Sequence, residues 1–128
     1  MKNKIEAVKA FHTAFNIGHR STPKADLGPA KNKLRFDLMK EENQEYFEAA
    51  QSNDLVEVAD ALGDMLYILC GTIIEHGMQD KIEAVFNEIQ RSNMSKLGAD
   101  GQPIYREDGK VLKGPHYFKP NIKSILEQ

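Results

Sequence analysis

The chain has 128 residues, 41% of them hydrophobic, which is enough for one domain with a modest apolar core. A formal net charge of −2 provides no overall attraction to nucleic acid or to an anionic membrane. No apolar run reaches the ~18 residues of a membrane span, and charges interrupt residues 1–15 too often for a signal peptide. With Cys70 as its only cysteine, the chain cannot form an internal disulfide, so we expect a single cytoplasmic domain over residues 1–128 without nucleic-acid or membrane partners.

Helical periodicity marks the first half of the chain. Residues 3–18 place Ile5, Val8, Phe11, His12 and Phe15 on one face, and Gly18 is the expected stop. A loop is expected from His19 to Pro29, because this stretch contains "STP" and "LGP". The second helix is expected from about Lys31 to Gln51.

Two more helices are expected before the chain changes character. Asp54 is a suitable N-cap for a third helix from about Leu55 to His76, and Gly77 ends it. A fourth helix begins near Gln79, and its apolar side chains recur at spacings of three, four and seven: Ile82, Val85, Phe86 and Ile89.

After Met94 the chain becomes rich in glycine and proline. Asp108–Gly109 separates two short β-capable runs and predicts a short β-hairpin, while residues 121–128 favour a short helix. The expected fold is all-α, a four-to-five-helix bundle with a helical core over about residues 1–97. An irregular tail, about residues 98–128, contains the hairpin.

The third helix carries acids within an otherwise apolar segment. Because an α-helix turns ~100° per residue, its apolar side chains cover all but a strip roughly 60° wide. Glu57, Asp60 and Asp64 lie in that strip, with Gly71 and Glu75 further along. On the second helix, Glu45 points in nearly the same direction as Leu34 and Leu38, and its flanking acids are Glu41, Glu42 and Glu48.

Two facing rows of carboxylates repel each other. At 6 Å and an effective dielectric constant of 20, each like-charged pair costs about 3 kcal/mol, which is a large fraction of the roughly 5–15 kcal/mol that stabilises a domain. An acidic run such as residues 40–45 is usually a solvated helix face, but the narrow strip on the third helix favours a metal site. Oxygen ligands select a hard cation, Mg²⁺ or Mn²⁺.

These acids also carry a family resemblance. "EENQE" followed by "EVADALGDMLYIL" resembles the signature of the all-α NTP pyrophosphohydrolases, which include MazG-like enzymes and phosphoribosyl-ATP pyrophosphohydrolase. Its usual form is E-x-x-E, preceded by a further glutamate, on one helix and E-x-x-D on the next. The tail from Arg91 to Phe118 looks like the C-terminal part of phosphoribosyl-ATP pyrophosphohydrolase-like members, so the resemblance covers nearly the whole chain.

The resemblance implies a set of metal ligands. Glu41, Glu42 and Glu45 match the first acidic cluster. Glu57 and Asp60 satisfy E-x-x-D literally, whereas "MLYIL" resembles the sequence after the family's aspartate, which would make that residue Asp64. In the second register Ala61 occupies the glutamate position. We prefer Asp60 with Asp64, which are i and i+4 on one helix, and Glu57 as an outer ligand.

The reaction implied by the resemblance is Mg²⁺-dependent cleavage of a (d)NTP between the α and β phosphates, giving (d)NMP and pyrophosphate. Such an enzyme would act in the clean-up or control of the nucleotide pool. Divalent ions offset the charge of the triphosphate and activate a water. Glu41 is our choice for the residue that orients or deprotonates this water.

Candidate substrate contacts lie on the first, third and fourth helices. Extending the fourth helix places Asn93 and Lys96 in the direction of Ile82, Phe86 and Ile89, so we expect them to face inward and contact phosphate. Arg91 would reach a site only across a subunit interface. His12 and Phe15 either stack on a nucleobase or belong to the core, and Tyr67, beside the acidic strip, has the same two alternatives.

The apolar arc of the third helix is wider than one small bundle can cover. We therefore expect a homodimer or homotetramer, as the resemblance also implies. The tail is a candidate lid that would bring Lys110 and Lys113 near the phosphates. A ferritin-like di-iron site is disfavoured, because no histidine follows a glutamate at the E-x-x-H spacing. The remaining alternative is a non-catalytic interaction or nucleotide-sensing module with an acidic docking face.

Overall fold

The computed structural model describes all residues from 1 to 128 and contains five helices and no strand. The chain forms two compact units, residues 1–80 and 81–128, which are described separately. The first contains α1 (Lys2–Ala14), α2 (Pro29–Gln51) and α3 (Leu55–Glu75). The second contains α4 (Ile82–Met94) and α5 (Ile122–Leu126). The expected all-α class is confirmed. None of the helices has the length and hydropathy needed to cross a bilayer.

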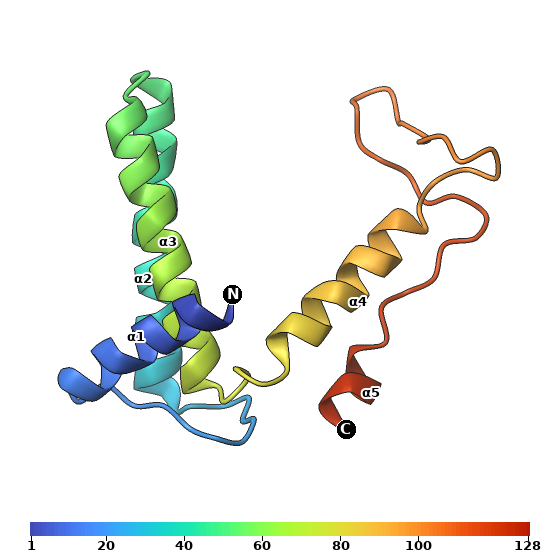
Figure 1. The fold of residues 1–128 in the computed structure, drawn as a ribbon. Helices are drawn as coiled ribbons and strands as arrows, with labels where there is room; N and C mark the ends of the chain where they lie inside the picture. Colours follow the sequence, from blue (N-terminus) through green and yellow to red (C-terminus); the bar gives the residue numbers. More distant parts are fainter. The chain divides into compact units, whose positions relative to one another are not determined.

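In the first unit, α2 and α3 lie side by side as an antiparallel hairpin, and α1 packs against α3 (Figure 1). Pro29 opens α2, a position where its missing N–H costs no helical hydrogen bond. Asp54 caps α3 as expected, since its side chain accepts a hydrogen bond of 3.1 Å from the backbone N–H of Glu57. The short connection between these helices fixes them as direct neighbours.

Three helices of this unit end at a residue in the left-handed conformation. Gly77 ends α3 with φ +70°, as expected. For α1 the expected stop at Gly18 is wrong, because Asn16 adopts φ +58° and the N–H of Ile17 bonds to the carbonyl of His12 at 2.8 Å. Asn53 plays the same part after α2 with φ +55°. Asparagine substitutes for glycine at such positions more readily than other residues do.

The loop between α1 and α2 is tied to the C-terminal end of α3. The backbone N–H of Arg20 donates to the carbonyl of Ile74 at 3.1 Å, and that of Lys24 to the carbonyl of His76 at 2.9 Å. At Gly77 an added Cβ would clash with the carbonyl of Thr22, so this close approach also requires glycine. The loop therefore caps α3 and closes one end of the first unit.

In the second unit, α4 packs with α5 and the tail. Ser92 is buried and its hydroxyl donates to the carbonyl of Phe118 at 2.8 Å. The buried face of α4 carries Val85 and Ser92, whereas Phe86 is 62% exposed. Within this unit the face with Phe86, Ile89 and Asn93 is exposed, and its expected direction toward the helical bundle stays a prediction.

The expected β-hairpin does not form as a pair of strands. A single antiparallel bridge joins Tyr105 and Val111, and Gly109, with φ +88°, makes the turn after Asp108. The hydrogen bond from the N–H of Leu112 to the carbonyl of Ile104, 2.8 Å, is the outermost of this small turn. The Asp-Gly signal thus located the turn correctly but not its extent.

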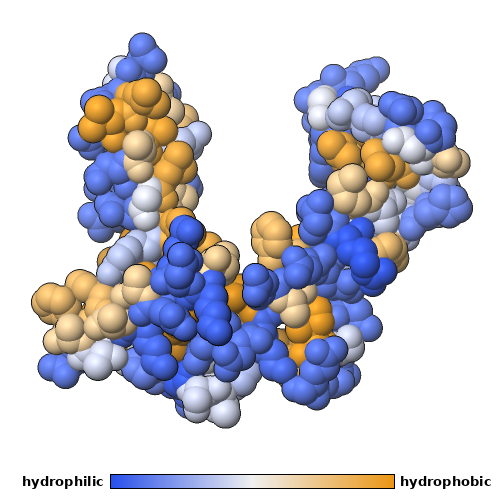
Figure 2. All heavy atoms as spheres, in the orientation of Figure 1, coloured by the Kyte–Doolittle hydropathy of each residue, from blue (hydrophilic) through white to orange (hydrophobic).

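Much apolar surface of the first unit is open. Figure 2 shows apolar side chains on the visible face of the α2–α3 hairpin. The exposed fractions reach 80% for Leu55, 75% for Val56 and 63% for Phe36. Its fully buried large side chains are only Ile74 and Cys70, so burial within one copy of the chain covers a small part of the apolar arc of α3.

Candidate functional site

The facing residues of α2 and α3 form a line of contact with alternating spacings of four and three, which we call the seam. On α2 the seam residues are Lys31, Arg35, Glu42, Glu45 and Ala49, with Leu38 at the position that continues the spacing. On α3 they are Glu57, Ala61, Asp64, Ile68, Gly71 and Glu75, with Thr72 next to Gly71. This spacing is that of two helices packed along one stripe. Because the helices are antiparallel, the start of α2 faces the end of α3.

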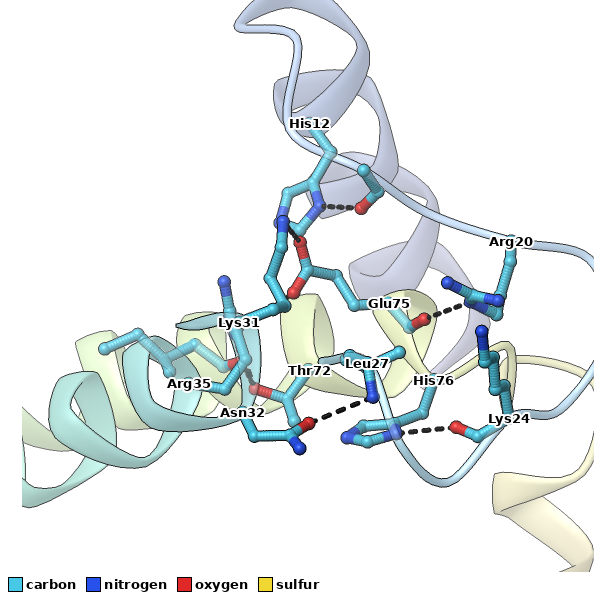
Figure 3. Close-up of polar contacts among 12 residues, drawn as sticks. His12, Arg20, Lys24, Leu27, Lys31, Asn32, Arg35, Thr72, Glu75 and His76 are labelled. Carbon is cyan, nitrogen blue, oxygen red and sulfur yellow. Dashed lines mark hydrogen bonds and ion pairs between the residues drawn. The ribbon is translucent and has the colours of Figure 1, made fainter. Parts of the chain in front are cut away.

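At that end of the seam, opposite charges meet. The carboxylate of Glu75 is only 3% exposed, and its Oε1 accepts from Lys31 Nζ at 2.9 Å (Figure 3). Arg35 Nε lies 3.7 Å from Glu75 Oε2 and donates to Thr72 Oγ1 at 3.0 Å. Burial lowers the pKa of Arg35, and the charge of Glu75 opposes that shift. Two cations thus compensate one buried acid.

Gly71 makes room for this arrangement. A Cβ built on Gly71 would lie 2.7 Å from Arg35 Nη2 and 2.8 Å from His12 Nε2, so both side chains pass over the bare helix backbone. His12 is buried, and its Nδ1 pairs with the carbonyl of Gly18 at 3.1 Å. This placement favours the interior role for His12 over the stacking role on a nucleobase.

At the opposite end of the seam only acids meet. Burial, the neighbouring carboxyl of Glu45, and the negative charges of Glu45, Asp64 and Glu41 raise the pKa of Glu42 to about 7. The Oε2 atom of Glu42 is buried and has no hydrogen-bond partner. No salt bridge reaches Glu41, Glu42, Glu45 or Asp64. No cation of the chain therefore offsets the repulsion that the sequence predicts among these acids.

A groove of about 250 Å³ extends this acidic end toward the α2–α3 connection. Its lining residues are Glu45, Glu48, Ala49, Ser52, Asp54 and Glu57. Glu57 thereby joins the first acidic cluster through Glu45, and Asp64 joins it through Glu42. Ala61, which lies between Glu57 and Asp64 along α3, is buried and adds no polar group at this point.

The donor set fits a hard divalent cation. It consists of carboxylate oxygens, one of them buried and unpaired, with no cation from the chain nearby. The side chains do not yet converge, since no group of three or more His, Cys, Asp or Glu residues has the geometry of a metal site. The ligand assignment of Glu42, Glu45, Glu57, Asp60 and Asp64 stays a prediction.

The two registers of the second acidic motif differ in placement. Asp64 is half-buried and adds its charge to the environment of Glu42, whereas Asp60 is exposed. Glu57 faces the groove. The structure therefore brings Glu57 and Asp64 to the seam and leaves Asp60 exposed. Glu41, the candidate catalytic residue, is exposed beside Glu42.

An aromatic cluster joins α1 to α3. Phe11 packs against Phe15, with ring centroids 4.5 Å apart, and meets Tyr67 edge-on at 5.6 Å. Phe15 and Tyr67 remain 65% and 43% exposed. Two of the expected base contacts thus lie together, and Phe11, which the sequence had marked only as part of an apolar face, connects them.

The candidate phosphate contacts lie in the second unit. Asn93 is exposed, Lys96 is half-buried and neither side chain takes part in an ion pair. Arg91 is held in place, because its Nε lies 2.8 Å from Glu88 Oε1 and its guanidinium stacks 4.2 Å from the centre of the Phe118 ring. These contacts favour a structural role for Arg91 over contact with substrate.

Arg35 and Glu75 were not assigned to a site from the sequence. Their signal was present, since Glu75 falls in the same narrow strip of α3 as Asp64 and Arg35 lies seven residues before Glu42. Spacing alone did not show that Lys31 and Arg35 would neutralise Glu75 at this end of the strip. Together they anchor one end of the hairpin that presents the acids at the other.

Known proteins resemble this chain in both sequence and structure. Residues 8–93 match the model of a family described as phosphoribosyl-ATP pyrophosphohydrolase. Uncharacterized protein L479 of Acanthamoeba polyphaga mimivirus is 48% identical over 46 residues, which are 36% of this chain and 18% of that protein. The chain thus matches less than a fifth of the length of this relative.

A solved structure adds the fold. A candidate NTP pyrophosphohydrolase from Exiguobacterium sp. 255-15 matches with a TM-score of 0.54 and 26% identity, over 98% of this chain and 94% of that one. This structural match agrees with the all-α architecture. Because the family match covers more than half of its length, this chain belongs to the phosphoribosyl-ATP pyrophosphohydrolase family, within the all-α NTP pyrophosphohydrolase superfamily.

Proposed function

We propose that this chain is a Mg²⁺-dependent nucleoside triphosphate pyrophosphohydrolase that cleaves a (d)NTP into (d)NMP and pyrophosphate. The observation that carries the proposal is the contrast along the seam: Glu75 is neutralised by Lys31 and Arg35, while Glu42 has only acids around it. A fold that compensates one carboxylate and leaves a cluster of others unpaired has room for cations from solution.

Each part of the reaction has candidate residues. Glu42, Glu45, Glu57 and Asp64, together with the exposed Asp60, would hold Mg²⁺ or Mn²⁺. The bound ion would supply charge neutralisation for the triphosphate and a water of lowered pKa. Glu41, exposed next to this cluster, would orient the attacking water or accept its proton.

The nucleobase of the substrate requires apolar contacts, and its phosphates require hydrogen-bond donors besides the metal ion. Phe15 and Tyr67 offer open ring faces for a nucleobase. Asn93 and Lys96 offer N–H donors for phosphate oxygens. The expected homodimer or homotetramer would cover the exposed apolar faces of α2 and α3. The cytoplasmic location is likewise a prediction, consistent with the buried thiol of Cys70.

A turnover assay tests the proposal. The chain is incubated with a panel of NTPs and dNTPs in Mg²⁺ or Mn²⁺, and the release of pyrophosphate is measured. We expect turnover that Asp64→Asn reduces by at least about a hundredfold, because the substitution removes a charged oxygen from the acidic end of the seam. Asp80→Asn, at an exposed position of the same unit, is the control.

Two results would contradict this function. Equal turnover in Asp64→Asn and the native chain would show that the acidic end of the seam takes no part in the reaction. Nucleotide binding without release of pyrophosphate from any member of the panel would instead favour the sensing module.

A further inference from the structure

A hollow of about 390 Å³ lies beside the loop between α1 and α2 in the first unit, and we call it the loop hollow. Its lining residues are Lys9, His19, Arg20, Ser21, Thr22 and Gln79. Lys9 belongs to α1, residues 19–22 belong to the loop, and Gln79 follows the end of α3. The hollow therefore joins three segments of the chain, and no acid is among its lining residues.

The part of the loop that lines the hollow is held in place by hydrogen bonds. The carbonyl of Arg20 accepts from Gln79 Nε2 at 2.7 Å, and Arg20 Nε donates to the carbonyl of Glu75 at 2.9 Å (Figure 3). The carbonyl of Thr22 lies so close to Gly77 that a Cβ there would be 2.1 Å from it. A ligand in the loop hollow would therefore meet groups that the fold has already positioned.

The chain does not neutralise the cationic groups of the loop hollow. Lys9 and His19 are exposed and take part in no ion pair, and Arg20 spends only its Nε, on a backbone carbonyl. The buried carboxylate of Glu75 lines a neighbouring hollow, where Lys31 already pairs with it at 2.9 Å. Two positive charges and an imidazole N–H donor thus line one hollow, an arrangement that favours an anion.

Gln79 adds a second requirement. Its Oε1 is buried and has no hydrogen-bond partner, and an unpaired buried acceptor costs about 1–3 kcal/mol. Its Nε2 is already bonded to the carbonyl of Arg20, so exchanging the two ends of the amide would break that bond. The group that satisfies Oε1 must therefore be a donor. A small movement of the exposed side chains that line the hollow would give a ligand access to this oxygen.

We propose that the loop hollow binds inorganic phosphate. Lys9, His19 and Arg20 would donate to its charged oxygens, and its P–OH group would donate to Gln79 Oε1. Inorganic phosphate keeps a P–OH group at neutral pH, whereas sulfate has none and a phosphate ester loses its last proton near about pH 6. An anion that is also a donor meets both requirements of the hollow, which the other two anions do not.

This site goes beyond the proposed reaction. Arg20 contacts Glu75, which is eleven residues from Asp64 and therefore about 16 Å away along α3. The loop hollow thus lies at the end of the first unit that the loop closes, away from the acidic end of the seam. Phosphate bound here would bridge α1, the loop and the residues after α3, and would stabilise the folded chain.

Calorimetric titration of the full chain at pH 8 tests the site, with EDTA present so that no divalent ion holds phosphate at the acidic seam. We expect saturable binding of inorganic phosphate. Sulfate and a nucleoside monophosphate, which lack a P–OH group at this pH, should each bind at least about tenfold more weakly, because they leave Gln79 Oε1 unpaired.

Lys9→Gln should weaken phosphate binding by about tenfold, because it removes a charge-assisted donor from the loop hollow. Lys2→Gln makes the same change two turns earlier on α1, outside the hollow, and should leave the affinity unchanged. In the turnover assay, Lys9→Gln should keep the KM of the native chain for nucleotide.

Four results would overturn the proposal. They are no binding of phosphate by the native chain, equal affinity for phosphate and sulfate, and equal phosphate affinity in Lys9→Gln and Lys2→Gln. The fourth is a raised KM in Lys9→Gln, which would assign the loop hollow to the nucleotide substrate instead. Loss of turnover throughout the nucleotide panel would refute the proposed function and leave the phosphate site standing.

Discussion

Glu42 and Glu75 are the same residue type on the same seam, yet their neighbours give them opposite properties. Glu75 is a charged, compensated group between Lys31 and Arg35. Glu42 faces Glu45 and Asp64, and its pKa rises to about 7. Without a divalent ion, no cation of the chain neutralises Glu42, and only a bound proton can do so. The protonation of Glu42 therefore indicates how closely the other acids surround it.

The raised pKa of Glu42 gives a stability profile with a definite sign. The folded chain binds a proton on Glu42 that the unfolded chain, with a pKa of about 4.5, has already released, so this contribution to stability is lost as the pH rises through about 7. In EDTA, the melting temperature of the native chain should fall from pH 5 to pH 8 more than that of Glu42→Gln.

The comparison with Glu42→Gln separates this group from other titrating side chains. Asp26, Glu88 and Asp108 have lowered pKa values, caused mainly by hydrogen bonds, and they titrate below this window. Parallel pH profiles for the native chain and Glu42→Gln would show that Glu42 is an ordinary solvated carboxylate.

Two glycines of α3 should respond in opposite ways to alanine. Gly71→Ala would place a methyl group 2.7 Å from Arg35 Nη2 and 2.8 Å from His12 Nε2, and we expect a loss of about 1–3 kcal/mol in unfolding free energy. Gly63→Ala meets no atom within 4 Å and should stabilise the helix by about 0.5–1 kcal/mol. Urea unfolding measures both, and a neutral Gly71→Ala would argue against the close approach.

At the scale of elements, the α2–α3 hairpin is anchored at one end and electrostatically strained at the other. The anchor is the cluster of Lys31, Arg35 and Glu75 beneath the loop that caps α3. Arg20 strengthens it, since its Nε donates to the carbonyl of Glu75 at 2.9 Å. A fixed anchor holds the register of the two helices and thereby keeps Glu42 opposite Asp64.

Removing the charge of Glu75 should destabilise the hairpin. Glu75→Gln leaves Arg35, which is 8% exposed, without its carboxylate partner, and we expect a loss of about 3 kcal/mol in unfolding free energy. Asp37→Asn removes an exposed i, i+4 partner of Lys33 and should cost less than about 0.5 kcal/mol. Equal losses in the two variants, measured by urea unfolding, would mean that the cluster is no anchor.

The elements were predictable where one periodicity decided them. Spacing, the Asp54 cap and Gly77 located α2 and α3 within a few residues. The strip on α3 was visible in the sequence, but it did not separate Asp64, which lies near Glu42, from the exposed Asp60. The end of α1 and the buried face of α4 were not predictable in this way. The first depends on the left-handed conformation of Asn16, and the second on the packing of the tail over Ser92. Such contacts between distant segments leave no periodic trace.

At the scale of the whole molecule, a single copy of the chain leaves many large apolar side chains exposed to solvent. Phe36 and Met65 border a hollow of about 420 Å³ on the α2–α3 hairpin, and Leu55 and Val56 are almost fully exposed. A large exposed apolar patch usually marks an interface. A second copy of the chain is the occupant that the expected homodimer would supply.

A charge placed in this hollow should disrupt the assembly. Phe36→Glu is expected to shift the chain from dimer or tetramer to monomer at micromolar concentration, since it would bury a carboxylate in an apolar interface. Ala50→Glu adds the same charge at an exposed position of α2 and serves as the control. Analytical ultracentrifugation gives the masses, and a native chain that sediments as a monomer would contradict the expected assembly.

The central claim is that the acidic end of the seam binds divalent cations. Calorimetric titration of the native chain with Mn²⁺ tests it most directly, with Asp64→Asn and the control Asp80→Asn titrated in parallel. We expect saturable heat in the native chain and in Asp80→Asn, and at least about tenfold weaker binding in Asp64→Asn, because a carboxylate oxygen is a far better ligand for a hard ion than an amide. No heat in the native chain, or the same affinity in all three proteins, would contradict the account.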